Sequence, residues 1–169
     1  MENKIQLSSL PLSLKILVTC FVCTLILGYG VALLQVYDRT HFDVARILLY
    51  YRGAETGEAI GMILPPSFST LLAATHAHTL SQPVMYLALG LVFVFSHLSE
   101  KKKSSLVLML FIGSVLSNSA PWLIRYVSAK MLFVLHLSQG LMMVSFFTMS
   151  FVILWDVWFR NTPIVRDEA

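Results

Sequence analysis

Three histidines lie within stretches of this chain that are otherwise apolar. Ionisable residues in such stretches are the first candidates for chemistry in a membrane protein. The three histidines are His76 and His78, two residues apart, and His136. Ionisable side chains are costly inside a bilayer, so each of them is a functional hypothesis. Neutral imidazole is also a common ligand of haem iron and of other metal ions. Of the other two histidines, His41 precedes the pair, and His97 stands near a run of lysines and is interpreted as an ordinary interfacial residue.

The spacing of these histidines limits the sites that they can form. Residues two apart on a helix of about 3.6 residues per turn point about 200° apart, so His76 and His78 cannot both reach one metal ion. This disfavours a compact three-histidine zinc or copper site. His136 follows Lys130 by six positions, and the histidine pair follows Leu71 by five and seven. The three imidazoles are therefore expected at nearly equal depth, roughly 9 Å below one surface.

A b-type haem is the cofactor that this arrangement predicts. In the simplest model His136 and either His76 or His78 are its two axial ligands, with the porphyrin held between helices of a bundle. The remaining histidine, paired with His41, would give a second haem, so one or two haems are expected. The sequence has no Cys-x-x-Cys-His motif, which excludes c-type attachment. Arginines that would pair with the haem propionates are Arg39, Arg46 and Arg125.

The elements that must position these residues are transmembrane helices. Of the 169 residues, 57% are hydrophobic and 12% are charged, against about 25% charged in ordinary soluble domains. Crossing a bilayer takes about 20 mostly apolar residues. The sequence therefore predicts an all-α, four-helix transmembrane bundle that forms one domain over residues 1–169. Its four spans are expected at about residues 16–36, 71–96, 105–126 and 131–158.

The basic residues predict which side of the membrane each loop faces. Residues 101–103 are three lysines in the short link between the second and third spans, and Lys4, Lys15, Arg160 and Arg166 flank the outermost spans. Short loops rich in Lys and Arg remain in the cytoplasm, so both termini are expected there. The lysine run is interpreted as a topology signal and not as a nucleic-acid surface. A bacterial inner membrane is the expected location, with the three histidines in its periplasmic half.

One long segment, at about residues 37–70, is expected outside the membrane. Within it Arg39, Asp43 and Arg46 recur at helical spacing among bulky apolar residues, and Gly53 supplies a helix stop. This pattern predicts either a helix lying in the headgroup interface or an extension of the first span.

The segment Thr75-His76-Ala77-His78, with the apolar run from Val84 to Phe93 after it, resembles a haem-bearing helix of haem-copper oxidases and nitric-oxide reductases. In their catalytic subunits an HxH pair presents its two imidazoles to two haems. The resemblance implies that His76 faces a high-spin haem and His78 a low-spin one. The segment is also similar to small four-helix membrane proteins with a THxH motif at the head of the second helix. The copper-ligating histidines of the large enzymes have no counterpart here, so haem ligation alone is implied.

Two functions are compatible with these features. The first is a b-type cytochrome that relays electrons near the periplasmic face, between quinol and a periplasmic or membrane subunit, with Gln82, Tyr86 or Gln139 as quinone contacts. The second is a non-catalytic accessory or assembly subunit of a larger membrane complex. In that case the histidines would hydrogen-bond to neighbouring polar side chains and hold helices together. Whether the chain is an enzyme stays open at this point.

Overall fold

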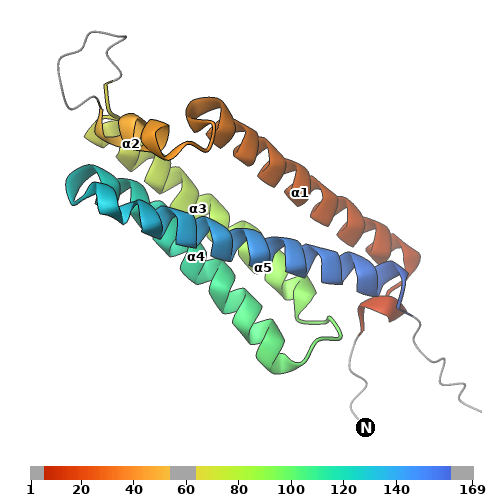
Figure 1. Ribbon diagram of the computed structural model, residues 1–169. Helices are drawn as coiled ribbons and strands as arrows, with labels where there is room; N and C mark the ends of the chain where they lie inside the picture. The colour runs from red at the N-terminus through yellow and green to blue at the C-terminus, as the bar shows by residue number, and fades with distance from the viewer. Residues whose placement is uncertain (1–5, 54–63, 161–169) are drawn as a thin grey trace, which may run out of the picture.

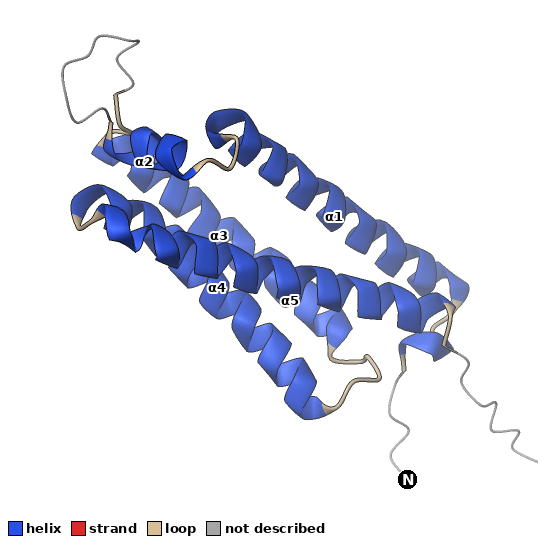
Figure 2. Cartoon of the chain, viewed as in Figure 1, coloured by secondary structure: helices blue, strands red, loops and turns tan. Residues whose placement is uncertain are grey.

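The computed structural model describes residues 6–53 and 64–160, and regular structure in these ranges is helical throughout. The long helices α1 (Leu12–Thr40), α3 (Phe68–Phe93), α4 (Glu100–Tyr126) and α5 (Leu132–Trp158) form an elongated bundle (Figure 1). The shorter helix α2 (Val44–Arg52) lies across one end, and short turns of 3₁₀ helix, η1 (Leu7–Ser9) and η2 (Ala129–Met131), precede α1 and α5 (Figure 2). The all-α prediction is confirmed.

The four predicted stretches each form one long helix, although the second is shifted. Its expected range was 71–96, whereas α3 ends at Phe93. Three helices in the described part of the chain are long and apolar enough to cross a membrane: α1, α4, and α5 together with its preceding turn. Helix α3 has 26 residues, but the histidines, hydroxyls and glutamine between Ser69 and Gln82 lower its hydropathy.

Local side chains explain where α2 and its neighbours begin and end. Helix α1 stops where His41 adopts a left-handed conformation with φ of 50°. Asp43 then caps α2, because its carboxylate accepts the Arg46 amide at 2.9 Å. Gly53 ends α2 with φ of 79°, as its place in the sequence predicted. Ser67 caps α3 by accepting the Thr70 amide at 3.1 Å.

Helices α4 and α5 make the closest contact in the bundle. A Cβ atom added to Gly113 would lie 2.7 Å from Met142 Cγ and 3.1 Å from the Ser138 carbonyl oxygen. Only a glycine lets the two backbones approach this far, as small residues do between membrane helices. Residues of all four long helices form one core next to this contact. Its fully buried members include Val22, Leu89, Phe93, Leu110, Met149 and Ile153.

Helix α1 packs on the bundle along only part of its length. Tyr29 stacks on Phe146 with ring centroids 4.8 Å apart, and Trp158 Nε1 donates to Thr19 Oγ1 at 2.9 Å. Beyond Tyr29 the α1 ribbon diverges from α5 toward α2 (Figure 1). The α1 residues that pack on the core also end at Tyr29; they are Val18, Phe21, Val22, Leu25, Ile26 and Tyr29. The bundle is therefore loosely packed on this side in the half nearest α2.

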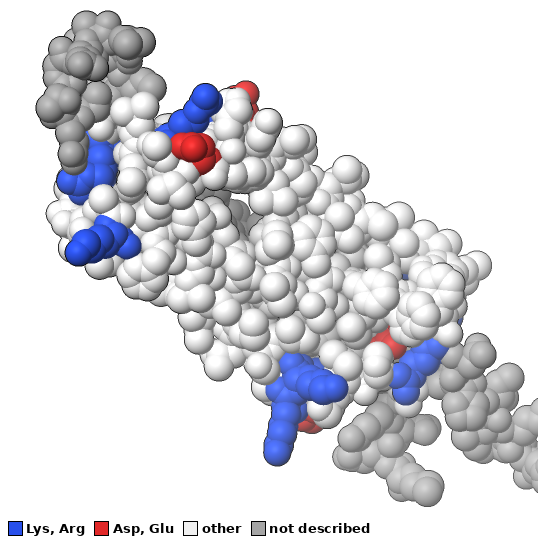
Figure 3. Space-filling model, viewed as in Figure 1, with Lys and Arg blue, Asp and Glu red and all other residues white. Residues whose placement is uncertain are grey.

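Charged side chains gather at the two ends of the molecule, and the visible surface between them is almost uncharged (Figure 3). Residues 101–103 mark one end, here called the lysine end. The opposite end, here called the α2 end, carries Arg39, Arg46, Arg52, Arg125 and Lys130. An uncharged band between two charged ends is the surface expected of helices that sit in a bilayer.

Gly113→Ala tests the contact between α4 and α5. The added methyl group must push Met142 and the backbone of α5 away, so we expect a loss of about 1–3 kcal/mol in the free energy of unfolding in detergent. Gly90→Ala is the matched control, because a Cβ at this position meets nothing within 4 Å and alanine favours a helix by about 0.5–1 kcal/mol. Equal effects of both changes on unfolding would contradict the close packing at Gly113.

Candidate functional site

The three histidines of the predicted haem site are exposed on α3 and α5. His76, His78 and His136 all fall in the exposed class, and within the described residues no hydrogen bond reaches any of their rings. Nor do three or more His, Cys, Asp or Glu side chains cluster as a metal site in that part of the chain. The structure thus leaves the imidazoles available and does not gather them into one compact centre.

Polar side chains next to the histidines on α3 bond to α4 instead. Thr75 Oγ1 accepts the Trp122 indole at 2.8 Å, while Gln82 Oε1 accepts Ser114 Oγ at 2.8 Å and Asn118 Nδ2 at 3.0 Å. These bonds hold α3 to α4 as interhelical polar contacts do in membranes. The accessory-subunit hypothesis expected neighbouring polar side chains to hydrogen-bond to the histidines. Thr75 and Gln82 bond to α4 instead.

These contacts give the depth of two histidines. Gln82 bonds to the residue after Gly113, and Gly113 itself touches the Ser138 carbonyl, so Gln82 and Ser138 lie at similar depth. His78 precedes Gln82 by four residues and His136 precedes Ser138 by two. At about 1.5 Å per residue they rise about 6 Å and 3 Å toward the α2 end. The two imidazoles therefore lie at nearly the same level.

His78 and His76 belong to opposite sides of α3. Residues seven or eleven apart share one side of a helix, and His78 is related in this way to the buried residues Leu71 and Leu89. Its side of α3 thus continues into the core of the bundle. His76 shares its side with leucines that are 51–61% exposed, namely Leu72, Leu80 and Leu87. His76 is therefore directed to the surroundings of the bundle, and His78 toward the bundle.

His136 lies on the side of α5 that faces α1. Phe147, eleven residues later on the same side, packs edge-to-face on Tyr29 of α1 with centroids 5.3 Å apart. One turn from His136, a Cβ on Gly140 would meet nothing within 4 Å. The side of α5 that carries His136 is therefore occupied by α1 near Phe147 and open near His136.

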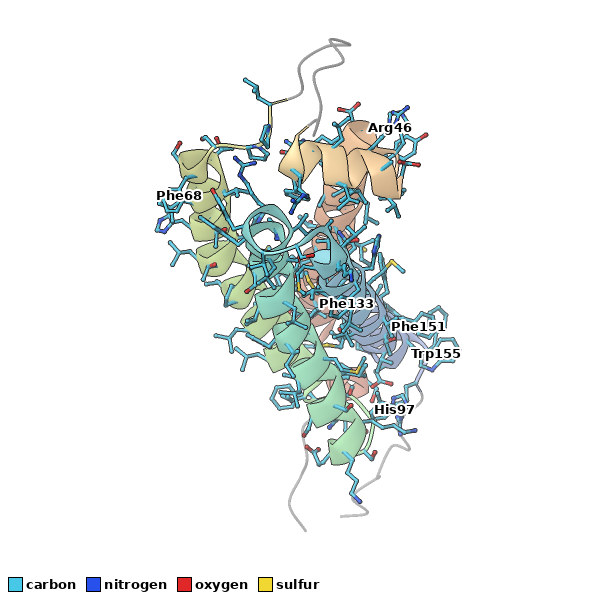
Figure 4. The ribbon with its side chains drawn as sticks, turned by 60° about the vertical axis from the view of Figure 1, so that its left-hand side comes forward. Arg46, Phe68, His97, Phe133, Phe151 and Trp155 are labelled. Atoms are coloured by element: carbon cyan, nitrogen blue, oxygen red, sulfur yellow. The ribbon has the colours of Figure 1, made fainter. Side chains whose placement is uncertain are left out.

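His41 has a partner that affects its use as a ligand. Its Nδ1 lies 2.9 Å from Arg46 NH1, and because a guanidinium only donates, Nδ1 must accept. Metal-bound histidines normally donate from their second ring nitrogen, so the contact with Arg46 would have to break first. Arg46 itself lies at the outer edge of α2 (Figure 4). Arg39 NH1 lies 3.5 Å from Tyr50 Oη.

Two arginines hold α2 against α4, one from each helix donating to a backbone carbonyl of the other. Arg52 NH1 donates to the Ile124 carbonyl near the end of α4, and Arg125 NH1 donates to the Tyr51 carbonyl near the end of α2, both at 3.1 Å. A cation near a helix C-terminus is favoured by the helix dipole. Burial beneath α2 raises the pKa of the Tyr51 phenol above its usual 10. Arg125, predicted to face a haem propionate, thus has a structural partner.

The lysine end contains a polar site that the sequence analysis missed. Asp156 is only 2% exposed; its Oδ2 accepts the His97 amide at 2.8 Å and its Oδ1 accepts the His97 ring Nδ1 at 2.6 Å. Arg160 NH1 lies 3.9 Å from the same carboxylate. A buried carboxylate requires such partners. Asp156 is the only acidic residue in the four predicted spans, and that signal could have revealed it.

The interpretation of His97 as an ordinary interfacial residue is therefore incomplete. Its two bonds to Asp156 draw the chain after α3 against the end of α5, which explains why α3 ends earlier than predicted. A histidine that donates from Nδ1 to a carboxylate keeps Nε2 for another partner. Figure 4 shows His97 beside the end of α5.

Comparison with known proteins gives one match. The model of the Aq_1264_TM family, described as a transmembrane helical domain, matches residues 41–164. This range contains α3, α4 and α5 entirely. No curated protein and no solved structure matches the chain.

Asp156→Asn tests the polar site at the lysine end. The amide keeps the size of the carboxylate but loses its charge and one acceptor oxygen, so we expect a loss of about 1–3 kcal/mol in the free energy of unfolding. Asp38→Asn is the control, because it makes the same change at an exposed carboxylate near the end of α1, and exposed charges contribute about 0–1 kcal/mol. Unfolding in detergent, followed by helical circular dichroism, measures both. Equal stability of the two variants would contradict the role given to Asp156.

Proposed function

The chain belongs to the Aq_1264_TM family of transmembrane helical domains, and we propose that it is a membrane-embedded b-type cytochrome with His78 and His136 as the haem ligands. The observation that carries this proposal is the similar depth of these two imidazoles on α3 and α5, neither of which makes a ring hydrogen bond within the described residues. The proposal concerns one haem, since a second site would have to use His76 and His41, and His41 already bonds to Arg46.

The proposed arrangement in the membrane has four spans. Helix α3, with 26 residues, is about 39 Å long and exceeds the roughly 30 Å hydrocarbon core. It runs beside α4, to which its polar side chains are bonded. With the lysine end in the cytoplasm, both termini lie inside and α2 lies at the periplasmic face of a bacterial inner membrane.

The surroundings of the two imidazoles support a haem held by α3 and α5 on the side of α1. The side of α3 with His78 continues into the core, the side of α5 with His136 is open around Gly140, and α1 packs on the core only as far as Tyr29. A planar group held by two helices would cover these surfaces. Neither imidazole has to give up a hydrogen bond to another described residue in order to ligate. When bound, haem supplies one-electron chemistry that the side chains themselves lack.

The arginines and the electron partners complete the proposal. Haem propionates would point to the α2 end, where Arg39, Arg46 and Lys130 are exposed cations. The electron donor is proposed to be a quinol, reaching α3 from the lipid on the side of His76. Among the predicted quinone contacts, Gln82 is bonded to α4 and Tyr86 is buried. A groove of about 340 Å³ between α3 and α4, lined by Thr79, Ser119 and Trp122 among others, offers the quinone ring an alternative place.

A second candidate function is that of an accessory subunit within a larger membrane complex. Helix α1 carries small side chains four residues apart on an exposed side, and such stripes allow membrane helices to pack closely. They are Cys20, Thr24, Gly28 and Ala32. The two functions are compatible, because a haem subunit can work inside a complex.

The reduced-minus-oxidised absorbance spectrum of protein purified from haem-replete cells tests the cytochrome. We expect the α band of a low-spin b-type haem and about one haem per chain by pyridine haemochrome assay, as bis-histidine ligation predicts. His78→Ala and His136→Ala should each abolish the low-spin spectrum. His76→Ala is the matched control, because it removes an equally exposed imidazole two residues away and should keep the spectrum.

A spectrum without haem bands would contradict the cytochrome and leave the accessory subunit. Loss of the haem in His76→Ala, with retention in His78→Ala, would contradict the ligand assignment. Helical circular dichroism of each variant separates loss of the cofactor from loss of the fold.

A further inference from the structure

A pocket of about 540 Å³ lies at the lysine end. It is enclosed by η1, the turn between α3 and α4, the first residues of α4 and the end of α5. Its lining is part polar and part apolar. The polar side chains include Ser96, His97, Lys103, Asp156 and Arg160, and the apolar ones include Leu7 and Phe95.

The first turn of α4 has an unusual charge for a helix N-terminus. Anions are favoured there and cations disfavoured, yet Glu100 is followed directly by the three lysines of residues 101–103. Ser99, at the capping position, accepts no capping bond from its side chain. The first amides of α4 therefore lack the usual side-chain acceptor, and Ser99 and Glu100 belong to the lining of the pocket. A bound anion would supply the missing acceptor and the missing negative charge.

Lys103 is the lysine of this turn that enters the pocket wall. It is 8% exposed, and its Nζ donates to the Val94 carbonyl at 2.6 Å and to Glu100 Oε1 at 3.1 Å. An ammonium group has three donors, so one remains for a ligand. Arg160, with its side chain 43% exposed, lines the same pocket from the end of α5.

Ser96 gives an independent indication that the pocket takes a ligand. Its side chain is 5% exposed, and its buried Oγ has no hydrogen-bond partner within the residues that the structure describes. Burying a hydroxyl without a partner is unfavourable. Ser96 belongs to the wall of this pocket, so rotation about its Cα–Cβ bond would turn the hydroxyl toward a bound group.

We propose that this pocket binds the phosphodiester headgroup of an anionic membrane lipid. Lys103, Arg160 and the α4 amides would contact the phosphate, and Leu7 and Phe95 would contact the start of the acyl chains. The two carboxylates of the site are already paired, Asp156 with His97 and Arg160, and Glu100 with Lys103. Basic pockets between helices at the cytoplasmic side are a recurrent form of lipid recognition. This proposal is independent of the haem.

Thermal unfolding in detergent, with phosphatidylglycerol, phosphatidylcholine or inorganic phosphate added, tests the proposal. A ligand that binds the folded state raises the unfolding temperature, so phosphatidylglycerol should raise it more than the other two. The variants are Lys103→Gln and Arg160→Gln, and each should remove most of the difference between the two lipids. Lys102→Gln is the control, because it removes the same charge from an exposed neighbouring residue and should keep the difference.

Three results would overturn the proposal. Equal shifts with both lipids would show that the anionic headgroup is not recognised. An equal loss in Lys102→Gln and Lys103→Gln would show a diffuse charge effect and no pocket. A shift with inorganic phosphate as large as that with phosphatidylglycerol would show a free-phosphate site. Arg160→Gln keeps the test decisive where Lys103→Gln fails to fold, because the Arg160 side chain is partly exposed.

Discussion

The contact of α4 with α5 at Gly113 is the constraint on which the other helix positions depend. The backbones meet there with no room for a Cβ, which fixes the relative height of the two helices. Because Ser114 is the next residue, its bond to Gln82 then fixes the height of α3. In a bilayer, where apolar surfaces gain little by meeting each other, such close packing and polar contacts hold helices together.

Both ends of the bundle are closed by bonds that link helix termini. At the lysine end Asp156 holds the turn after α3, and at the α2 end Arg52 and Arg125 join α2 to α4. Between these ends, α1 packs on the core only as far as Tyr29 and then diverges from α5. His136 lies on the side of α5 that faces α1, so a group bound there would add packing that α1 does not supply.

The sequence predicted the helices well because long apolar runs have few alternatives in a bilayer, and Gly53 correctly ended α2. Contacts between residues far apart in the chain could not be predicted from the sequence. The early end of α3 follows from Asp156, which lies 63 residues beyond Phe93 (156 minus 93). Spacing alone placed His76 and His78 on opposite sides of a helix, but only the buried neighbours Leu71 and Leu89 show which side meets the bundle.

Polar side chains on α3 and α5 fall into two sets, and the difference bears on function. The first set, which includes Thr75, Gln82 and Asp156, makes hydrogen bonds between helices, so its presence in the membrane is explained by structure alone. The second set comprises the three exposed imidazoles, whose rings make no hydrogen bond within the described residues. Polar groups in a bilayer are costly unless they are satisfied. Within the described residues the second set has no such partner, and the proposed haem would supply one for His78 and His136 by ligation through their ring nitrogens.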